Sequence, residues 1–178
     1  MKRAGGVIHK RHGEQGAVLV LAAVGVAVFI LILGLVIDIS HFYAAKAELQ
    51  NAADAAALAA ASALRDPPET TALDIERATS RAVETLNTYE FNKRPVNIER
   101  GDVRFSETVD GNRDLVGEMD ETAAKSNPAN IRFVRVTIPA ESTSIPIFFA
   151  YVLGNAKQLS ATATARKVAA SSIPVLIK

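Results

Sequence analysis

The longest apolar stretch of the chain runs from Ala17 to Ile37 and contains no charged, amide or hydroxyl side chain. A helix of this length rises roughly 31 Å, which matches the ~30 Å hydrocarbon core of a bilayer. A soluble protein would have to bury such a helix on every side, and the mostly polar remainder of this chain is poorly suited to do so. The pattern therefore predicts a transmembrane helix over residues 17–37.

The helical pattern continues beyond this span. Neither proline nor glycine occurs between Asp38 and Leu64, and twelve of the twenty residues from 44 to 63 are alanine, the best helix former. We therefore predict one continuous helix from about residue 17 to residue 64, whose second half projects roughly 40 Å from the membrane. One side of this second half is apolar and allows very close approach of a packing partner: Phe42, Ala45, Leu49, Ala52, Ala56, Ala59 and Ala63.

A second helix is predicted after a proline-containing connector. Asp66 is the expected N-cap, Pro67 the first helical residue, and Glu69 the capping-box residue three positions on. Apolar residues then recur every three or four positions over residues 69–91: Ile75, Ala78, Ala82, Leu86 and Tyr89. The short connector turns this helix back against the alanine-rich helix.

From Val96 onward the hydrophobic period changes to two, which is typical of strands. Alternation predicts strands at 96–98, 103–109 and 131–138. Asp110-Gly111 is a hairpin turn signal, so a weak return strand is expected at 113–116. In the strongest strand one face is apolar and the other polar; the apolar face consists of Val134, Val136 and Ile138. Between these strands, residues 119–130 are expected to form a loop or a short helical turn.

The C-terminal third adds two apolar segments and a final strand. Residues 145–153 are expected to form a short helix that fills the core, because this segment is about half the length needed to cross a membrane. The strand at 159–168 carries small residues on one face: Leu159, Ala161, Ala163 and Ala165. Such a face suits close packing, so we expect this strand to contact the alanine-rich helix. Residues 171–178 are interrupted by Pro174 and are expected to form an edge strand or a docking peptide.

These elements together predict an α+β protein. It has a long N-terminal transmembrane helix that continues into an alanine-rich helix, a second antiparallel helix, and a small, mainly antiparallel sheet. The predicted organisation is a cytoplasmic basic tail at 1–16, the transmembrane helix at 17–37, the two helices at 38–92, and a β-rich exported head packed on them at 93–178.

The formal net charge of +1 hides an asymmetry across the predicted span. Residues 1–16 carry four Lys or Arg against one Glu, whereas residues 38–178 carry sixteen basic and eighteen acidic side chains. By the positive-inside rule the N-terminus stays cytoplasmic and the residues after Asp38 are translocated. This predicts a single-pass protein of the inner (cytoplasmic) membrane with a periplasmic or extracellular C-terminal domain. A cleaved signal peptide is the alternative, but its apolar region is usually about 7–15 residues long, so we favour an uncleaved anchor.

Residues suited to catalysis or to metal binding are scarce. The chain has no cysteine and only three histidines, which excludes disulfides and thiol chemistry and leaves no basis for a catalytic triad. His9 and His12 lie in the basic tail, where solvated side chains are the favoured interpretation over a metal pair. No phosphate-binding loop or metalloprotease motif occurs, and the nearly neutral exported part offers little for nucleic acid. We therefore expect no cofactor, no nucleic-acid partner and no enzymatic activity, with an anchored enzyme as the alternative.

The residues that we single out for helix packing or interaction all follow the span: Asp38, Phe42, Leu49, Ala52, Ala53, Asp54, Ala56 and Ala59. Two alternatives stay open for the alanine face, namely packing within the chain and packing between chains. Asp38 and Asp54 are either partners of another helix or ordinary interfacial and solvated acids.

The N-terminal region combines several features in a fixed order. A basic lead with Gln15-Gly16 precedes the long span, and Asp38 and the pair Phe42-Tyr43 follow it. The run Leu-Gln-Asn-Ala-Ala-Asp-Ala-Ala-Ala-Leu-Ala then occupies residues 49–59. With these features, residues 14–64 resemble the N-terminal region of the TadE/TadG-like proteins of tight-adherence (Flp) pilus assembly.

This resemblance implies a structural or scaffold component of a pilus assembly or related secretion system. Its implied partners are the lipid bilayer, other pilus-assembly or secretion proteins, and further copies of the chain. The alternative is a pilin-like subunit that polymerises through its N-terminal helix. Prepilin-like members are cleaved after a glycine and carry glutamate at the fifth mature position. Here that position is Val18 or Leu21, which disfavours such processing.

Overall fold

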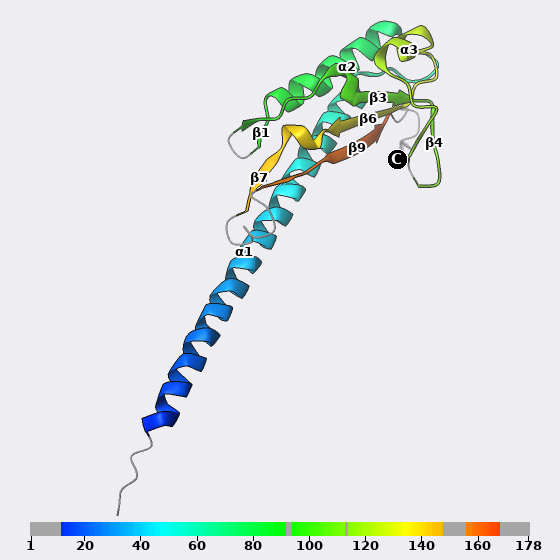
Figure 1. Ribbon diagram of the computed structural model, residues 1–178. Helices are drawn as coiled ribbons and strands as arrows, with labels where there is room; N and C mark the ends of the chain where they lie inside the picture. Colours follow the sequence, from blue (N-terminus) through cyan, green and yellow to red (C-terminus); the bar gives the residue numbers. More distant parts are fainter. Residues whose placement is uncertain (1–11, 92–93, 113, 148–155, 168–178) are drawn as a thin grey trace, which may run out of the picture.

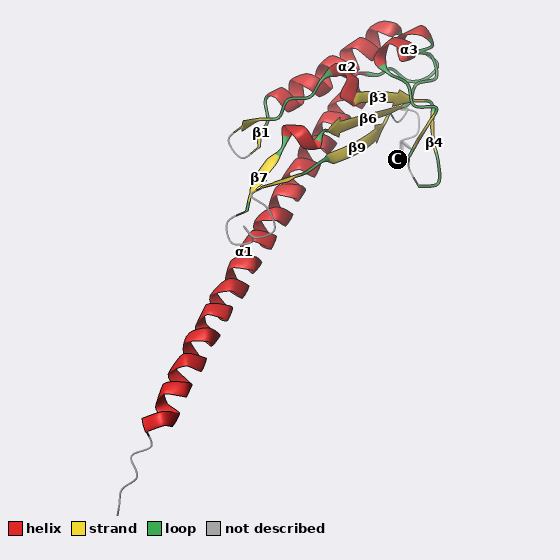
Figure 2. Cartoon of the chain, in the orientation of Figure 1, coloured by secondary structure: helices red, strands yellow, loops and turns green. Residues whose placement is uncertain are grey.

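The structure is a computed structural model that describes residues 12–91, 94–112, 114–147 and 156–167. Its dominant element is the helix α1 (His12–Ala63), 52 residues or ~78 Å long. The other elements gather beside the second half of α1, while its first half stands alone (Figures 1 and 2). The predicted α+β class is confirmed, because further helices and small antiparallel sheets accompany this long helix.

The bounds of α1 differ slightly from the prediction. The helix begins at His12, so residues 12–16 are helical although the sequence placed them in the tail; residues 1–11 lie outside the described residues. Extending an existing helix by one turn needs no new nucleation, which explains the added residues. At the other end, the Leu64 N–H donates to the Ala61 carbonyl at 3.2 Å, so the helix closes with a tightened turn.

The second helix, α2 (Ala72–Asn87), begins later than predicted because its N-cap is Thr71, not Asp66. The Glu69 N–H donates to the Asp66 carbonyl at 2.8 Å, so these residues form a turn before the helix. Thr71 and Asp74 then form a capping box, in which the Asp74 carboxylate accepts the Thr71 N–H at 2.9 Å. The prediction was also wrong at the C-terminal end, since Glu90–Phe91 form a short strand, β1, paired with β2 (Arg94–Pro95).

The central sheet has three antiparallel strands in the order β3 (Val103–Ser106), β6 (Phe133–Ile138) and β9 (Ala161–Arg166). Burial alternates along β6 as predicted, with the three apolar side chains Val134, Val136 and Ile138 fully buried. Helix α1 contacts both β9 and β6, so the expected contact between the final strand and the alanine-rich helix is confirmed.

Smaller elements complete the head. The strands β4 (Thr108–Val109) and β5 (Leu115–Val116) pair as the predicted hairpin, and the short helix α3 (Glu121–Ser126) lies in the segment predicted as a loop or helical turn. Two 3-10 turns, η1 (Arg100–Asp102) and η2 (Ala140–Ser142), connect the larger elements.

Two predicted elements around the sheet are corrected. Val96 and Ile98 are buried but lie outside any strand. The alternation of apolar residues predicted their burial correctly but not their secondary structure. Ser144–Pro146 do not begin a helix; they form strand β7, which pairs with β8 (Ala156–Gln158). Residues 148–155, which complete that predicted helix, and the tail at 171–178 lie outside the described residues.

The core is built around the second half of α1, which packs against α2 and against the sheet. Its buried arc is broader than the predicted stripe, because two neighbours cover the helix from different sides. Ala59 and Ala63 are only partly buried, whereas four alanines outside the predicted stripe are buried. The buried residues of this half are Ala45, Leu49, Ala52, Ala53, Ala56, Ala57, Ala60 and Ala61. Alanine allows both neighbours to approach the helix closely.

Asp74 gives the α2 terminus a pH-dependent contribution to stability. Its side chain is 2% exposed and lies 3.4 Å from Arg65 Nε and 3.7 Å from Arg77 Nη1. Burial by itself raises the pKa of Asp74, but the hydrogen bonds from Thr71 and the two guanidinium charges outweigh it and lower the pKa below its ordinary value. The charged form is therefore favoured by folding, and its contribution is lost as the pH falls through the depressed pKa.

We expect Asp74→Asn to lower the free energy of unfolding by about 1–3 kcal/mol at pH 7, because the cap loses its charged acceptor. The difference from the unmodified protein should shrink below about pH 4, where Asp74 is protonated in the unfolded chain. Thermal unfolding at pH 7 and pH 3 measures this, with the exposed Glu84→Gln as control. A difference that stays constant between the two pH values would contradict the assignment.

Candidate interaction surfaces along the long helix

The first half of α1 exposes its apolar side chains on all sides. From Val18 to Ile37 the large hydrophobic residues are 43–74% exposed. The helix from Gly16 onward is long and apolar enough to cross a membrane. Because no described element covers this half (Figure 1), lipid is the environment that satisfies it.

The residues that follow the span form a transition from lipid to head. Asp38 is partly buried, and the neighbouring Phe42 packs against the edge of the core. Tyr43 is 68% exposed, and its ring meets that of Phe42 edge-on, with 6.3 Å between centroids. One ring thus faces the protein and the other faces outward, at the height where aromatic side chains favour a membrane interface.

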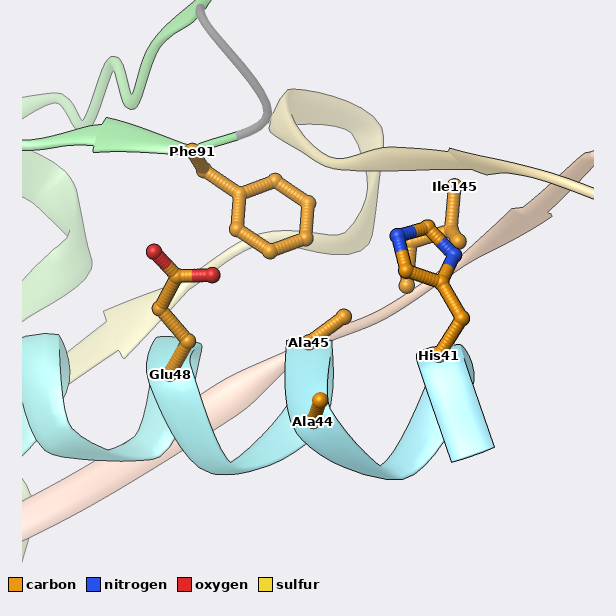
Figure 3. A pocket seen from close by; sticks show the side chains of 6 residues that line it. All are labelled: His41, Ala44, Ala45, Glu48, Phe91 and Ile145. Carbon is orange, nitrogen blue, oxygen red and sulfur yellow. The ribbon is translucent and has the colours of Figure 1, made fainter. Parts of the chain in front are cut away.

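A small apolar pocket of about 110 Å³ lies where the head begins. Figure 3 shows Phe91 and Ile145 facing α1 across this pocket, with His41 and Glu48 at its two ends. Ala44 and Ala45 form its floor. The pocket places β1 and β7 against α1 within three turns of the end of the span, so the head begins close to the membrane surface.

The predicted alanine face is covered by the chain's own head. Leu49, Ala52, Ala53 and Ala56 are buried, while Ala59 is partly buried. Their neighbours are α2 and the central sheet. In the single chain these residues therefore act in intramolecular packing.

Polar contacts fix the head on α1 at two places. Gln50 Nε2 donates to the Thr162 carbonyl of β9 at 3.0 Å and to Asp54 Oδ1 at 3.1 Å. On the other side, Tyr89 Oη donates to the Glu48 carbonyl at 3.3 Å. Burial and the nearby Glu48 raise the pKa of Tyr89, so this hydroxyl stays protonated as a donor. Asp54 itself is exposed at the rim of the contact.

The described residues contain no group of three or more His, Cys, Asp or Glu that is suited to a metal ion. The acidic side chains that are buried in the head, Asp74 and the largely covered Glu121, are both committed to structural contacts. Glu121 binds Arg100 in a two-point contact of 2.7 and 2.8 Å and lies 2.7 Å from Lys125 Nζ, and the bonds from Arg100 lower its pKa.

Helix α1 is the part of the chain that matches a known protein family. Residues 16–63 match the family described as putative Flp pilus-assembly TadE/G-like. The matched region is α1 from Gly16 to its last residue, and the resemblance seen in the sequence is thereby confirmed. No curated protein and no solved structure gave a match.

The TadE/G-like match and the candidate membrane helix together support a membrane-anchored protein related to Flp pilus assembly. The sequence found the helix, its apolar half and its alanine face. It missed Gln50 and Thr162 as the polar link between α1 and β9. Gln50 was visible inside the TadE/G-like run, but only the register of β9 shows what it binds.

Proposed function

We propose that this protein is a single-pass scaffold of a tight-adherence pilus assembly system in the inner membrane, with its head in the periplasm. The observation that carries the proposal is the division of one continuous helix into a lipid-exposed half and a head-packed half. Because no break separates the halves, the head is held rigidly at a fixed height above the bilayer. A fixed platform is what a scaffold needs to position other components.

The structure also favours binding over catalysis. The pockets along α1 are small and apolar, or open grooves, and the buried acids already have structural partners. The proposed scaffold would offer its partners the exposed sides of α1 and the edges of the head, not a reactive centre. Its partners in this proposal are lipid and other pilus-assembly proteins.

The orientation of the scaffold rests on the four basic residues of the tail. A periplasm-active phosphatase fused after Lys178 is expected to be active, and a cytosol-active fluorescent protein at the same place dark. As a matched control, replacing Lys2, Arg3, Lys10 and Arg11 by glutamate should reverse or randomise these signals. Fluorescence in the cytosol from the unmodified tail would contradict the proposed orientation.

A pilin-like subunit that polymerises through α1 is the alternative. The largely exposed first half of α1 favours it as well, because such a surface can pack against other copies after leaving the membrane. The intact mass of the protein from membranes separates the two functions. An unprocessed N-terminus is expected for the scaffold, whereas a chain that begins at Glu14 or Ala17 would support the subunit.

A further inference from the structure

Strand β9 is the open edge of the central sheet. The sheet has the order β3-β6-β9, so β6 is enclosed by its two neighbours. The far side of β3 is closed by Met119, which exchanges two backbone hydrogen bonds of 2.9 Å with Phe105. Within the described part of the chain, the outer side of β9 therefore lacks a strand partner along its whole length.

The backbone groups that β9 presents at this edge follow from the alternation of the ladder. The backbone N–H and C=O of Phe105 bond to Met119, on the side of β3 away from β6. Its partner Val134 therefore directs its own backbone groups to the other side, at β9, and so do Val136 and Ile138. Their partners in β9 are Ala161, Ala163 and Ala165. The backbone groups of Thr162, Thr164 and Arg166 consequently point outward. The bond from Gln50 to the Thr162 carbonyl agrees with this assignment.

A groove of about 350 Å³ lies along this edge, and both an acidic and a basic side chain line it. Asp54 and Gln50 line it from α1, and Thr162 and Thr164 line it from β9. Arg166 also lines the groove and lies over the ring of Phe133, 5.8 Å from its centroid. Among the described residues, neither Asp54 nor Arg166 forms an ion pair.

A second copy anchored in the same membrane is excluded from antiparallel pairing with this edge. Ile145, which pairs with Lys157, lies near His41 and Ala45, whereas Thr162 lies beside Gln50; the segment from β8 to β9 thus runs along α1 in the same direction (Figure 1). Antiparallel pairing of two β9 strands would therefore point their α1 helices in opposite directions. Two such helices cannot both be anchored from the same side of one membrane.

We propose that the β9 edge binds an extended segment of another protein, which adds to the sheet as a fourth strand. The segment carries a basic side chain near Asp54 and an acidic side chain near Arg166, so that both charges gain a partner. Backbone hydrogen bonds with Thr164 and Arg166 supply the affinity, and the two charges set the register. This inference deepens the proposed scaffold function by naming a partner surface, and its failure would leave the orientation test of the scaffold unaffected.

The experiment is photocrosslinking of the full chain in its own cells, with a photoreactive residue in place of the exposed Thr162. We expect capture of one contiguous segment of another protein, identified by mass spectrometry of the crosslinked peptide. Thr164→Pro removes the outward N–H of an edge strand, together with the hydroxyl that accepts from Arg135 Nε at 3.1 Å. Asp54→Lys reverses a charge on α1. Each should reduce the yield by about fivefold or more, whereas Glu69→Lys, an equal charge change outside the groove, should not.

The same segment should not be captured from Leu73, which is exposed on α2. Thermal unfolding of each variant checks that the head is folded. If Thr164→Pro fails to fold, Asp54→Lys still tests the proposal, because Asp54 lies on α1 outside the sheet. A crosslink to residues 168–178 of the same chain, a crosslink to a second copy, or no crosslink at all would overturn the proposal. So would a yield that neither variant changes.

Discussion

Replacing Phe105 by alanine is expected to lower the free energy of unfolding of the head by about 3–5 kcal/mol, because a fully buried ring leaves a cavity. Phe105 is among the largest fully buried side chains, lies opposite Val134 in the register of β3 and β6, and is closed off by Met119. The loss is a large share of the stability of a domain of this size.

Phe133→Ala is the matched control for this prediction. Phe133 has the same side chain one strand away, but it is only partly buried and contacts Arg166 on the outer face. Its loss should cost less than about 1.5 kcal/mol. Thermal unfolding and limited proteolysis in lipid nanodiscs measure both variants. Equal destabilisation by the two substitutions would show that the core is not centred on Phe105.

The Phe105→Ala variant also tests whether membrane anchoring by α1 depends on folding of the head. No described element of the head covers the first half of α1 (Figure 1), so Phe105→Ala should stay in the membrane after alkaline washing. Proteolysis should then leave a membrane-bound fragment that contains α1. If the variant were instead released from the membrane, the span would depend on the head, contrary to its exposed surface.

Features governed by a single local rule could be predicted from the sequence. The long helix follows from apolar length and alanine propensity, and the faces of β6 follow from strict alternation of Val134, Val136 and Ile138. The hairpin at Asp110-Gly111 follows from turn chemistry. In each of these the tertiary contacts agree with the local pattern, so the pattern alone is enough.

The predicted helix starts were wrong where the local sequence was compatible with two structures. Both Asp66 and Thr71 precede a residue suited to a capping box, and the tandem prolines between them made the first look stronger. In the structure the Asp66 carbonyl closes a turn with the Glu69 N–H, and the helix begins only after Thr71. Likewise Pro146 reads as a helix start, but pairing of β7 with β8 requires an extended chain there. Such choices are decided by partners distant in sequence.

The candidate surfaces were predictable only in part. The alanine face was visible in the sequence, but its division between α2 and the sheet was not, since periodicity locates one stripe and not two neighbours. The open edge of β9 depends on strand order, which no local pattern contains. Asp54 was singled out as a candidate for interaction, and only the structure places it in the lining of a groove.

The alanines of α1 should tolerate enlargement only on the exposed side of the helix. Ala56 is fully buried between the neighbours of α1, so Ala56→Leu adds three carbon atoms where no space exists. We expect it to lower the free energy of unfolding by about 1–3 kcal/mol or to displace the head. Ala47→Leu makes the same change at an exposed position of the same helix and should lie within about 0.5 kcal/mol of the unmodified protein.

Thermal unfolding distinguishes the two alanine variants, and their effect on pilus assembly adds a second readout. If alanine is needed only for packing inside the chain, Ala56→Leu should fail in assembly and Ala47→Leu should not. If Ala47→Leu is stable but still fails, the exposed side of the helix contacts another component. Equal stability of both variants would mean that the head does not press on α1 at Ala56. The alanine run would then owe its presence to helix propensity and not to close packing.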